Sequence, residues 1–418
     1  MSAKDLEVVV FGATGVTGRR AAGYLASCGV GRWAVAARDR VRTERVLAEE
    51  GVSAPEIIEA DVTRPESLEA IATRARVVLN FVGPYARYAQ PLIRACVAGG
   101  AHYADLSGEM PFLRRTIEEF QAPAMAAGVK VVQPCGFESL PPDLAVRLAA
   151  ETARAQLGEP LENVELEVRL RPPPGLPRPS DGISGGTFGS MIVALEEEDP
   201  RTILDPAALI EDPQRAAAVR LRSPIALAPR RGTEESVLAP MTPVAYINPA
   251  VIQRTAALAE PDAPPPRYRE GVALGGSAAT LPLRWAAAGA LAGVQVALRA
   301  GLKASSPQRR RIARALGALA PPSGYGPQQD RLEGWTWSML VRGHTAHRGT
   351  VEVRVDASGH PGYLATARML AEAGLLMAEE GATPALAGCL PPALAFGTAT
   401  LLRFERAGMS FSASLDGA

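Results

Sequence analysis

A glycine-rich turn directly after a hydrophobic stretch near the amino terminus constrains the fold more than any other feature of this sequence. Residues Leu6 to Phe11 are rich in β-branched side chains, which is typical of a buried parallel strand. The stretch stops at Gly12, and residues 12–18 lead into residues 19–27, whose composition favours a helix. A strand, a glycine turn and a helix start in this order predict a dinucleotide-binding unit.

Each glycine of the turn has its own role in such a unit. Gly12 allows the tight turn, Gly15 lets the backbone approach a pyrophosphate, and Gly18 lets the helix pack closely on the strand. Free N–H groups at the helix start then face the phosphates. The alternative is a glycine turn without a ligand. The residues that we assign to the cofactor site from this turn are Gly12, Ala13, Thr14, Gly15, Val16, Thr17 and Gly18.

The end of the second predicted strand bears on the choice between NAD and NADP. Residues Trp33 to Ala37 form this strand, and an NAD site usually places an acidic residue at its end to bind the ribose 2′-hydroxyl. Here Arg38 occupies that place, with Asp39 directly after it. A guanidinium group can hold a 2′-phosphate, so the sequence favours NADP. The alternative is a solvated Arg38 beside Asp39.

Strands and helices alternate strictly as far as residue 143 and predict a parallel, doubly wound sheet of the Rossmann type. Ligands bind such sheets at the carboxyl ends of the strands. Asp61 lies at one of these ends, where it either contacts the cofactor or caps the helix that follows it. The cofactor contacts that this rule adds are Arg38, Asp61, Val62, Asn80, Val82, Gly83, Pro84, Tyr85 and Gly136.

The alternation stops after Asp143. Residues 164–170 and 350–355 alternate between apolar and polar side chains, which predicts a mixed sheet that packs helices on one face. The fold class is therefore α/β, with a parallel Rossmann sheet and a second α+β part. We expect three regions: an NADP-binding Rossmann domain (1–145), an α+β substrate or dimerisation domain (146–385), and a carboxyl-terminal helical segment (386–418) that returns to the Rossmann domain.

Composition and charge exclude several classes of protein. The chain has 44 basic and 44 acidic residues and only 5% aromatic residues, which argues against a nucleic-acid partner. Its four cysteines are far apart, and the pair His344 and His347 has no accompanying ligand pattern, so we expect no metal site. The amino terminus lacks the pattern of a signal peptide, and we expect a cytoplasmic protein.

Residues 271–329 are unusual, because they contain seven basic residues and no acidic one. Their apolar core, 285–296, is shorter than the about 20 residues that a membrane span needs, which argues against a transmembrane helix. Three interpretations stay open. The segment is a buried helix with a basic neighbour, or an interfacial helix that contacts a membrane peripherally through 281–314, or a basic surface that docks an acidic carrier domain.

Several motifs resemble those of a known family. In the first part they are residues 11–18, 80–85, 103–109 and 135–143, and in the second part 185–187, 268–270, 362–367, 390–393 and 406–409. Over nearly its full length the chain is thereby similar to the saccharopine dehydrogenase-like oxidoreductases, and within them to the trans-acting enoyl reductases of lipid and polyketide biosynthesis. The family often has Asp where this chain has Glu138. The resemblance implies NADPH and the reduction of an enoyl chain held on a synthase carrier domain.

Enoyl reduction needs a hydride at the β-carbon, stabilisation of an enolate and a proton at the α-carbon. We take Tyr85, Ser139 and Glu138 as the catalytic candidates. Tyr85 would contact the reacting group, or alternatively form an aromatic wall beside the nicotinamide. Glu109 and Glu138 could relay a proton or cap helices.

Two other functions stay open. A saccharopine-reductase-type imine reductase would expose several Arg or Lys side chains to bind substrate carboxylates, whereas an acyl site would be apolar. A non-catalytic NADP-binding, lipid-associated scaffold protein would bind the cofactor and never oxidise it. The sequence also leaves open whether the chain forms a homodimer.

Overall fold

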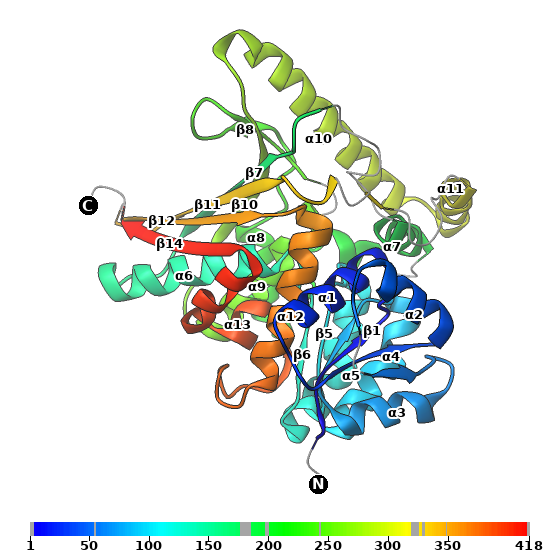
Figure 1. Cartoon of the computed structure of the whole chain (residues 1–418). Coiled ribbons are helices and arrows are strands. Elements are labelled where there is room, and N and C mark those ends of the chain that lie inside the picture. Colours follow the sequence, from blue (N-terminus) through cyan, green and yellow to red (C-terminus); the bar gives the residue numbers. More distant parts are fainter. Residues whose placement is uncertain are drawn as a thin grey trace.

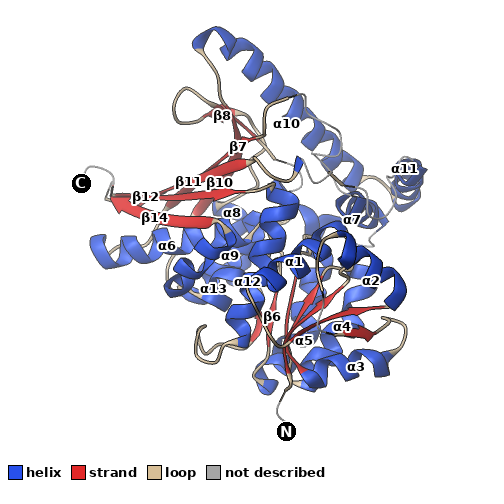
Figure 2. Cartoon of the chain, in the orientation of Figure 1, coloured by secondary structure: helices blue, strands red, loops and turns tan. Residues whose placement is uncertain are grey.

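Two seven-stranded sheets organise the chain in the computed structural model (Figures 1 and 2). The structure describes residues 4–53, 56–175, 185–196, 200–241, 244–318, 326–327, 331–347 and 349–415.

Sheet A has the strand order β13-β6-β5-β4-β1-β2-β3, and every neighbouring pair is parallel. The predicted Rossmann sheet is therefore confirmed. Its strands are β1 (Leu6–Phe11), β2 (Trp33–Ala37), β3 (Ile57–Glu59), β4 (Ala75–Asn80), β5 (His102–Asp105), β6 (Lys130–Val132) and β13 (Gly388–Leu390). The helices packed on it are α1 (Val16–Ser27), α2 (Arg40–Glu49), α3 (Pro65–Arg74), α4 (Tyr85–Gly99), α5 (Met110–Ala127) and α12 (Thr366–Ala378).

Burial on both faces explains why the strands of sheet A are continuous apolar runs. Val8 and Val10 of β1 belong to the same core as α1 and α12, whereas Val9 and Phe11 pack in the core with α3, α4 and α5. Successive side chains of a strand point to opposite faces, so each face takes every second residue. Both faces of sheet A are therefore shielded from solvent. The carboxyl ends of its strands face the second part of the chain.

Sheet B is mixed, as predicted, with the order β14-β12-β11-β7-β10-β9-β8. Only β7 and β10 are paired in parallel; the other neighbours are antiparallel. Its strands are β7 (Asn163–Arg171), β8 (Arg230–Arg231), β9 (Val237–Ala239), β10 (Arg267–Leu274), β11 (Thr336–His344), β12 (Thr350–Ser358) and β14 (Met409–Leu415). The remaining α-helices are α6 (Leu140–Leu157), α7 (Gly185–Glu196), α8 (Pro213–Arg222), α9 (Asn248–Ala259), α10 (Leu281–Lys303), α11 (Ser306–Ala318) and α13 (Pro392–Phe396).

The carboxyl-terminal segment contributes a strand to each sheet. Strand β13 pairs with β6 of sheet A, and β14 pairs with β12 of sheet B. The predicted helical segment is present as the short helix α13, which ends at Gly397 with φ of +71°, and a 3₁₀ segment, Thr398–Ala407, but the prediction missed the two strands. Helix α12, although far from the Rossmann residues in sequence, also packs on sheet A, where Gly374 lies against Leu79.

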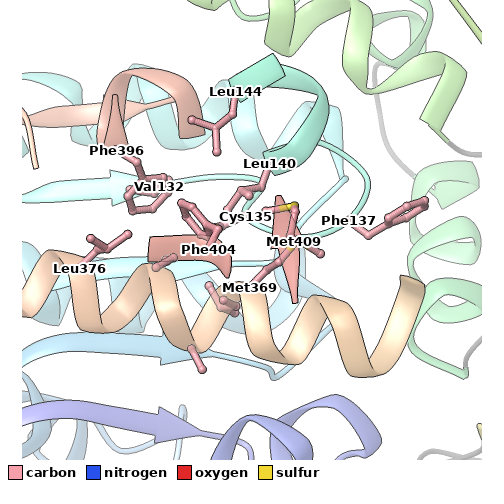
Figure 3. Close-up of a cluster of buried hydrophobic side chains, with 14 of the residues drawn as sticks. Val132, Cys135, Phe137, Leu140, Leu144, Met369, Leu376, Phe396, Phe404 and Met409 are labelled. Carbon is pink, nitrogen blue, oxygen red and sulfur yellow. The ribbon is translucent and has the colours of Figure 1, made fainter. Parts of the chain in front are cut away.

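One hydrophobic core joins the two sheets. Side chains from β6, α6, α12, α13 and β14 meet in the cluster of Figure 3, and the same cluster continues into sheet B. Leu140 and Leu144 of α6 belong to this cluster together with Val132 of sheet A and Val353 of sheet B. The end of sheet A and the beginning of the second part are thus fixed relative to each other.

Helix α10 differs from its prediction in length and in burial. It extends well beyond the apolar run at 285–296, and it is long and apolar enough, by length and composition, to cross a membrane. The length argument against a membrane span therefore fails. Only 17% of its most apolar stretch is buried, which overturns the interpretation as a buried core helix.

Candidate cofactor and active site

The turn between β1 and α1 has the backbone shape that a dinucleotide needs. Gly12 has φ of +96°, and a Cβ atom there would lie 2.6 Å from Cγ2 of Val82. A Cβ atom on Gly18 would lie 2.4 Å from the carbonyl oxygen of Gly12, so only glycine allows this approach of helix and strand. Helix α1 has no acidic residue in its first turn to compete with a phosphate. These features fit an NADP pyrophosphate.

Arg38 is exposed at the carboxyl end of β2. Its neighbour Asp39 is the N-cap of α2 and accepts a hydrogen bond from the backbone N–H of Arg42 at 2.9 Å. Among the residues that the structure describes, Arg38 forms no ion pair. An exposed guanidinium group here is compatible with the predicted contact to a 2′-phosphate, and the carboxylate of Asp39 is engaged in capping α2.

Asp61 stabilises the loop that follows β3. Its carboxylate accepts hydrogen bonds from the backbone N–H and the hydroxyl of Thr63, both at 2.8 Å, and these bonds lower the pKa of Asp61. The N-cap of α3 is Arg64, so Asp61 does not cap the helix itself. With Val62, it lies at the same end of sheet A as Arg38.

A buried polar network fastens the carboxyl ends of β4, β5 and β6. The Asn80 amide donates to the Tyr103 hydroxyl at 2.8 Å, and its oxygen accepts from the backbone of Val82 at 2.9 Å. Asp105 accepts from the Tyr103 hydroxyl and from the Gln133 amide, both at 2.7 Å. Burial raises the pKa of Asp105 to about 7. The Asn80 side chain is therefore used in hydrogen bonds within the protein, where it shapes the loop that leads to Gly83 and Pro84.

Tyr85 begins α4, and Glu109 caps that helix. The carboxylate of Glu109 accepts from the backbone N–H of Tyr85 at 3.0 Å and of Ala86 at 2.8 Å. Ser190 of α7 donates to the same carboxylate at 2.7 Å, which brings α7 to the end of sheet A. The Tyr85 hydroxyl is buried and donates a long bond of 3.4 Å to the carbonyl of Asn80. Burial, Asp105 and the nearby glutamates raise its pKa.

The loop between β6 and α6 places the other two catalytic candidates. A Cβ atom on Gly136 would lie 2.9 Å from Leu106, so this glycine is needed for close packing. Glu138 is partly exposed as a residue, and desolvation of its carboxyl group by the surrounding protein raises its pKa. Ser139 is fully buried and donates its hydroxyl proton to the side-chain oxygen of Asn248 at 2.8 Å. In this arrangement Ser139 links the two parts of the chain and has no proton left for a ligand.

Asn248 continues a hydrogen-bond chain that sequence reasoning missed. Its amide donates to Glu270 at 2.8 Å, and Tyr268 donates to the same carboxylate oxygen at 2.8 Å. Burial raises the pKa of Glu270 to about 7. The motif at 268–270 drew attention through the family resemblance but suggested no role, and Asn248 has no local sequence signal.

A second contribution comes from residues 360–366, which overlap the family motif at 362–367 but whose role the sequence did not reveal. Tyr363 lies beside Val16 of the glycine turn, because a Cβ atom on Gly326 would be 3.3 Å from Tyr363 and 3.2 Å from Val16. Its ring packs 4.9 Å from that of His360. Thr366 accepts a hydrogen bond from the backbone of Phe137 at 3.1 Å. Aromatic groups from the second part therefore adjoin the cofactor turn.

Two predicted features lie away from this site or outside the described residues. The side chain of His344 contacts Thr350 at 3.0 Å, and His347 pairs with Glu159 at the surface. Residues 185–187 begin α7, and residues 176–184 before them are outside the described part of the chain.

Comparisons with known proteins agree with this geometry. Residues 8–132 match the family model described as the saccharopine dehydrogenase NADP binding domain. The chain is 33% identical over 434 residues to a trans-acting enoyl reductase of Mycobacterium ulcerans, covering 98% of both chains. It is 32% identical over 429 residues to a trans-acting enoyl reductase of Mycobacterium tuberculosis, covering 97% of both. The structure of yeast saccharopine dehydrogenase (L-Glu forming) shares the fold, with a TM-score of 0.54, 14% identity and 98% and 99% coverage.

The fold and the site thus define an NADP-dependent oxidoreductase with a Rossmann cofactor domain. More narrowly, the chain belongs to the saccharopine dehydrogenase-like oxidoreductases, in the group that contains the trans-acting enoyl reductases.

Proposed function

We propose that this oxidoreductase is an NADPH-dependent enoyl reductase that acts in trans on an enoyl thioester of a lipid or polyketide, carried on a synthase carrier domain. The observation that carries the proposal is similarity across the whole length of relatives that bear this name, including the second part of the chain. A similarity confined to the Rossmann residues would indicate only the cofactor.

The charges near Tyr85 favour a neutral acyl substrate over an amino acid. Its hydroxyl lies in the field of three carboxyl groups, those of Asp105, Glu109 and Glu138. An imine reductase of the saccharopine type must hold substrate carboxylates with cations, whereas the titratable groups that act most on Tyr85 are carboxyl groups. An enoyl thioester has no negative charge near its double bond, so it tolerates the same surroundings.

The proposed reaction adds one hydride and one proton across the carbon–carbon double bond. The bound NADPH supplies the hydride to the β-carbon. The Tyr85 hydroxyl would donate to the thioester oxygen as negative charge develops there, exchanging its weak bond to Asn80 for a stronger one. Glu138, whose raised pKa keeps it protonated to higher pH, would donate the proton that the α-carbon takes up, and would then regain a proton from solvent because it is partly exposed. Ser139 would hold the loop in place.

The experiment is an NADPH-oxidation assay with trans-2-enoyl thioesters of pantetheine, run beside an α-keto acid and amino acid mixture. We expect turnover with the enoyl thioesters and a loss of about 10²-fold or more in kcat for Tyr85→Phe, because one oxyanion donor contributes about that factor. Turnover with the amino-acid mixture alone would support an imine reductase. Cofactor binding without turnover of either would support a scaffold protein.

A further inference from the structure

Helix α10 lies at the edge of the molecule (Figure 1) and carries exposed apolar side chains that the cofactor site does not use. Its buried residues, Arg284, Ala288, Gln295 and Leu302, are spaced by four and seven and therefore form one stripe that faces the rest of the protein. Most of the remaining helix is exposed. The large apolar side chains that we call the α10 surface are Leu283 (70% exposed), Trp285 (36%), Leu291 (42%), Val294 (60%), Val296 (58%) and, on α11, Ile312 (39%).

Positive charge is concentrated beside the α10 surface. The chain as a whole is balanced, with 44 basic and 44 acidic residues, yet 271–329 contain no acidic residue. None of the exposed basic side chains at the carboxyl end of α10 and on α11 forms an ion pair with a residue that the structure describes. These side chains are Arg299 and Lys303 of α10 and Arg310, Arg311 and Arg314 of α11.

Exposed apolar side chains next to a cluster of basic side chains match the chemistry of an anionic lipid surface. The apolar side chains would enter the boundary between head groups and acyl chains, while the cations would contact lipid phosphates. Trp285 is a residue type that favours this boundary. An acidic protein domain would bind the cations and leave the apolar side chains uncovered. It therefore accounts for the basic side chains but not for the exposed apolar ones.

Contacts along α10 determine how it would meet a membrane. At its start, Arg284 donates to the carbonyl of Glu235 at 2.7 Å and to that of Ser277 at 2.8 Å. At its middle, the Tyr246 hydroxyl donates to the carbonyl of Gln295 at 2.9 Å. At its end, Leu302 packs in a small core with α7 and α11. A spanning orientation would break all three attachments, whereas a helix lying flat keeps them.

We propose that the α10 surface docks this protein on an anionic membrane, with α10 lying flat at the level of the head groups. This peripheral contact goes beyond the reductase activity and does not depend on which substrate is reduced.

The first test is co-sedimentation with vesicles of phosphatidylcholine mixed with phosphatidylglycerol, against vesicles of phosphatidylcholine alone. We expect binding to the mixed vesicles, and binding weaker by about tenfold or more after Val294→Asp with Val296→Asp. Replacing Arg310, Arg311 and Arg314 with Gln should weaken binding by a similar factor. Leu221→Asp, at an apolar residue of α8 that is 88% exposed, is the matched control and should bind as the wild type does.

The second test uses the fluorescence of Trp285. The other three tryptophans, Trp33, Trp335 and Trp337, are buried, so lipids with brominated acyl chains should quench mainly Trp285. Trp285→Phe should remove the quenching and leave vesicle binding measurable.

Three outcomes would overturn the proposal. One is a wild-type protein that sediments with neither vesicle. Another is vesicle binding that Val294→Asp with Val296→Asp leaves unchanged while NADPH binding shows that the variant is folded. The third is a homodimer that the same variant converts to a monomer without any lipid binding, which would identify the α10 surface as an interface between two copies.

Discussion

At the scale of single residues, the cofactor turn and the catalytic candidates differ in how directly their roles follow from their positions. Gly12 and Gly18 are fixed by backbone geometry, because a side chain at either would meet other atoms at 2.6 Å or less. Ser139 is defined by a partner 109 residues away in sequence. The first kind of residue can be predicted from a motif, whereas the second needs the folded chain.

Gly18→Ala should weaken NADPH binding without unfolding sheet A. The added Cβ atom meets the carbonyl oxygen of Gly12 at 2.4 Å, so α1 must move away from the turn that holds the pyrophosphate. We expect the Kd for NADPH to rise about tenfold or more, a loss of about 1.4 kcal/mol or more. Fluorescence titration measures it.

The matched control is Gly23→Ala in the same helix, where the added Cβ atom would lie 3.6 Å from Val52, an ordinary contact. This variant should bind NADPH as the wild type does and gain about 0.5–1 kcal/mol of stability from the better helix former. Equal affinity in the two variants would contradict the role given to Gly18.

Arg38→Ala should lower the preference for NADPH over NADH. Removing the exposed guanidinium leaves the 2′-phosphate without its cation, and we expect an about tenfold or larger increase in the Kd for NADPH. The Kd for NADH should stay nearly unchanged, because NADH lacks this phosphate. Arg42→Ala, in the first turn of α2, controls for the loss of one positive charge. A parallel weakening of both nucleotides by Arg38→Ala would place the arginine elsewhere in the site.

At the scale of elements, the sequence predicted those whose pattern follows from burial. The strands of sheet A could be recognised because burial on both faces makes them apolar without interruption, and β12 because burial on one face makes it alternate. Strand β13 has only three residues, and its pairing with β6 brings together distant parts of the chain, so it has no periodic signal. The interpretation of α10 as a buried helix was wrong. It arose because an apolar composition is typical of buried helices.

Helix α6 shows how a single carboxyl group joins several elements. Asp143 accepts from the Thr255 hydroxyl of α9 at 2.6 Å and from the backbone N–H of Ala393 in α13 at 2.8 Å. Burial raises its pKa to about 7. The same position was visible in the sequence only as part of the motif at 135–143.

The raised pKa of Asp143 predicts how stability depends on pH. The folded protein keeps this proton between pH 3.8 and about 7, whereas the unfolded chain releases it, so the free energy of unfolding should fall as pH rises through this range. Asp143→Asn should show a shallower fall, together with a loss of about 1–3 kcal/mol at low pH from its missing acceptor. Urea unfolding at several pH values measures both.

Asp212→Asn, at an exposed helix cap, controls for the loss of one carboxylate. A variant Asp143→Asn with the wild-type slope would mean that Asp143 does not carry the proton.

At the scale of the whole molecule, the two sheets behave as one body, because a single core contains residues of both. Trp337 of sheet B and Val132 of sheet A belong to the same cluster, and the final residues of the chain add a strand to each sheet. The cofactor turn and the second part of the chain are held together by this core, which is what a hydride transfer between them requires.

Unfolding should therefore be a single cooperative transition. Circular dichroism reports the helices, and tryptophan fluorescence reports Trp33 in sheet A together with Trp335 and Trp337 at sheet B. We expect the two signals to give the same urea midpoint, both in the wild type and in Trp285→Phe, which removes the exposed tryptophan. Two separated midpoints would show that the Rossmann residues fold independently of sheet B.

The most direct test of the proposed chemistry follows an isotope. The protein is incubated with an enoyl chain on a purified carrier domain and with NADPH carrying deuterium at the transferable position, and the acyl product is examined by mass spectrometry. We predict a saturated chain with one deuterium at the β-carbon, and none when the same enoyl chain is offered with deuterated NADH. An unchanged enoyl chain beside a folded, NADPH-bound protein would contradict the proposed enoyl reduction.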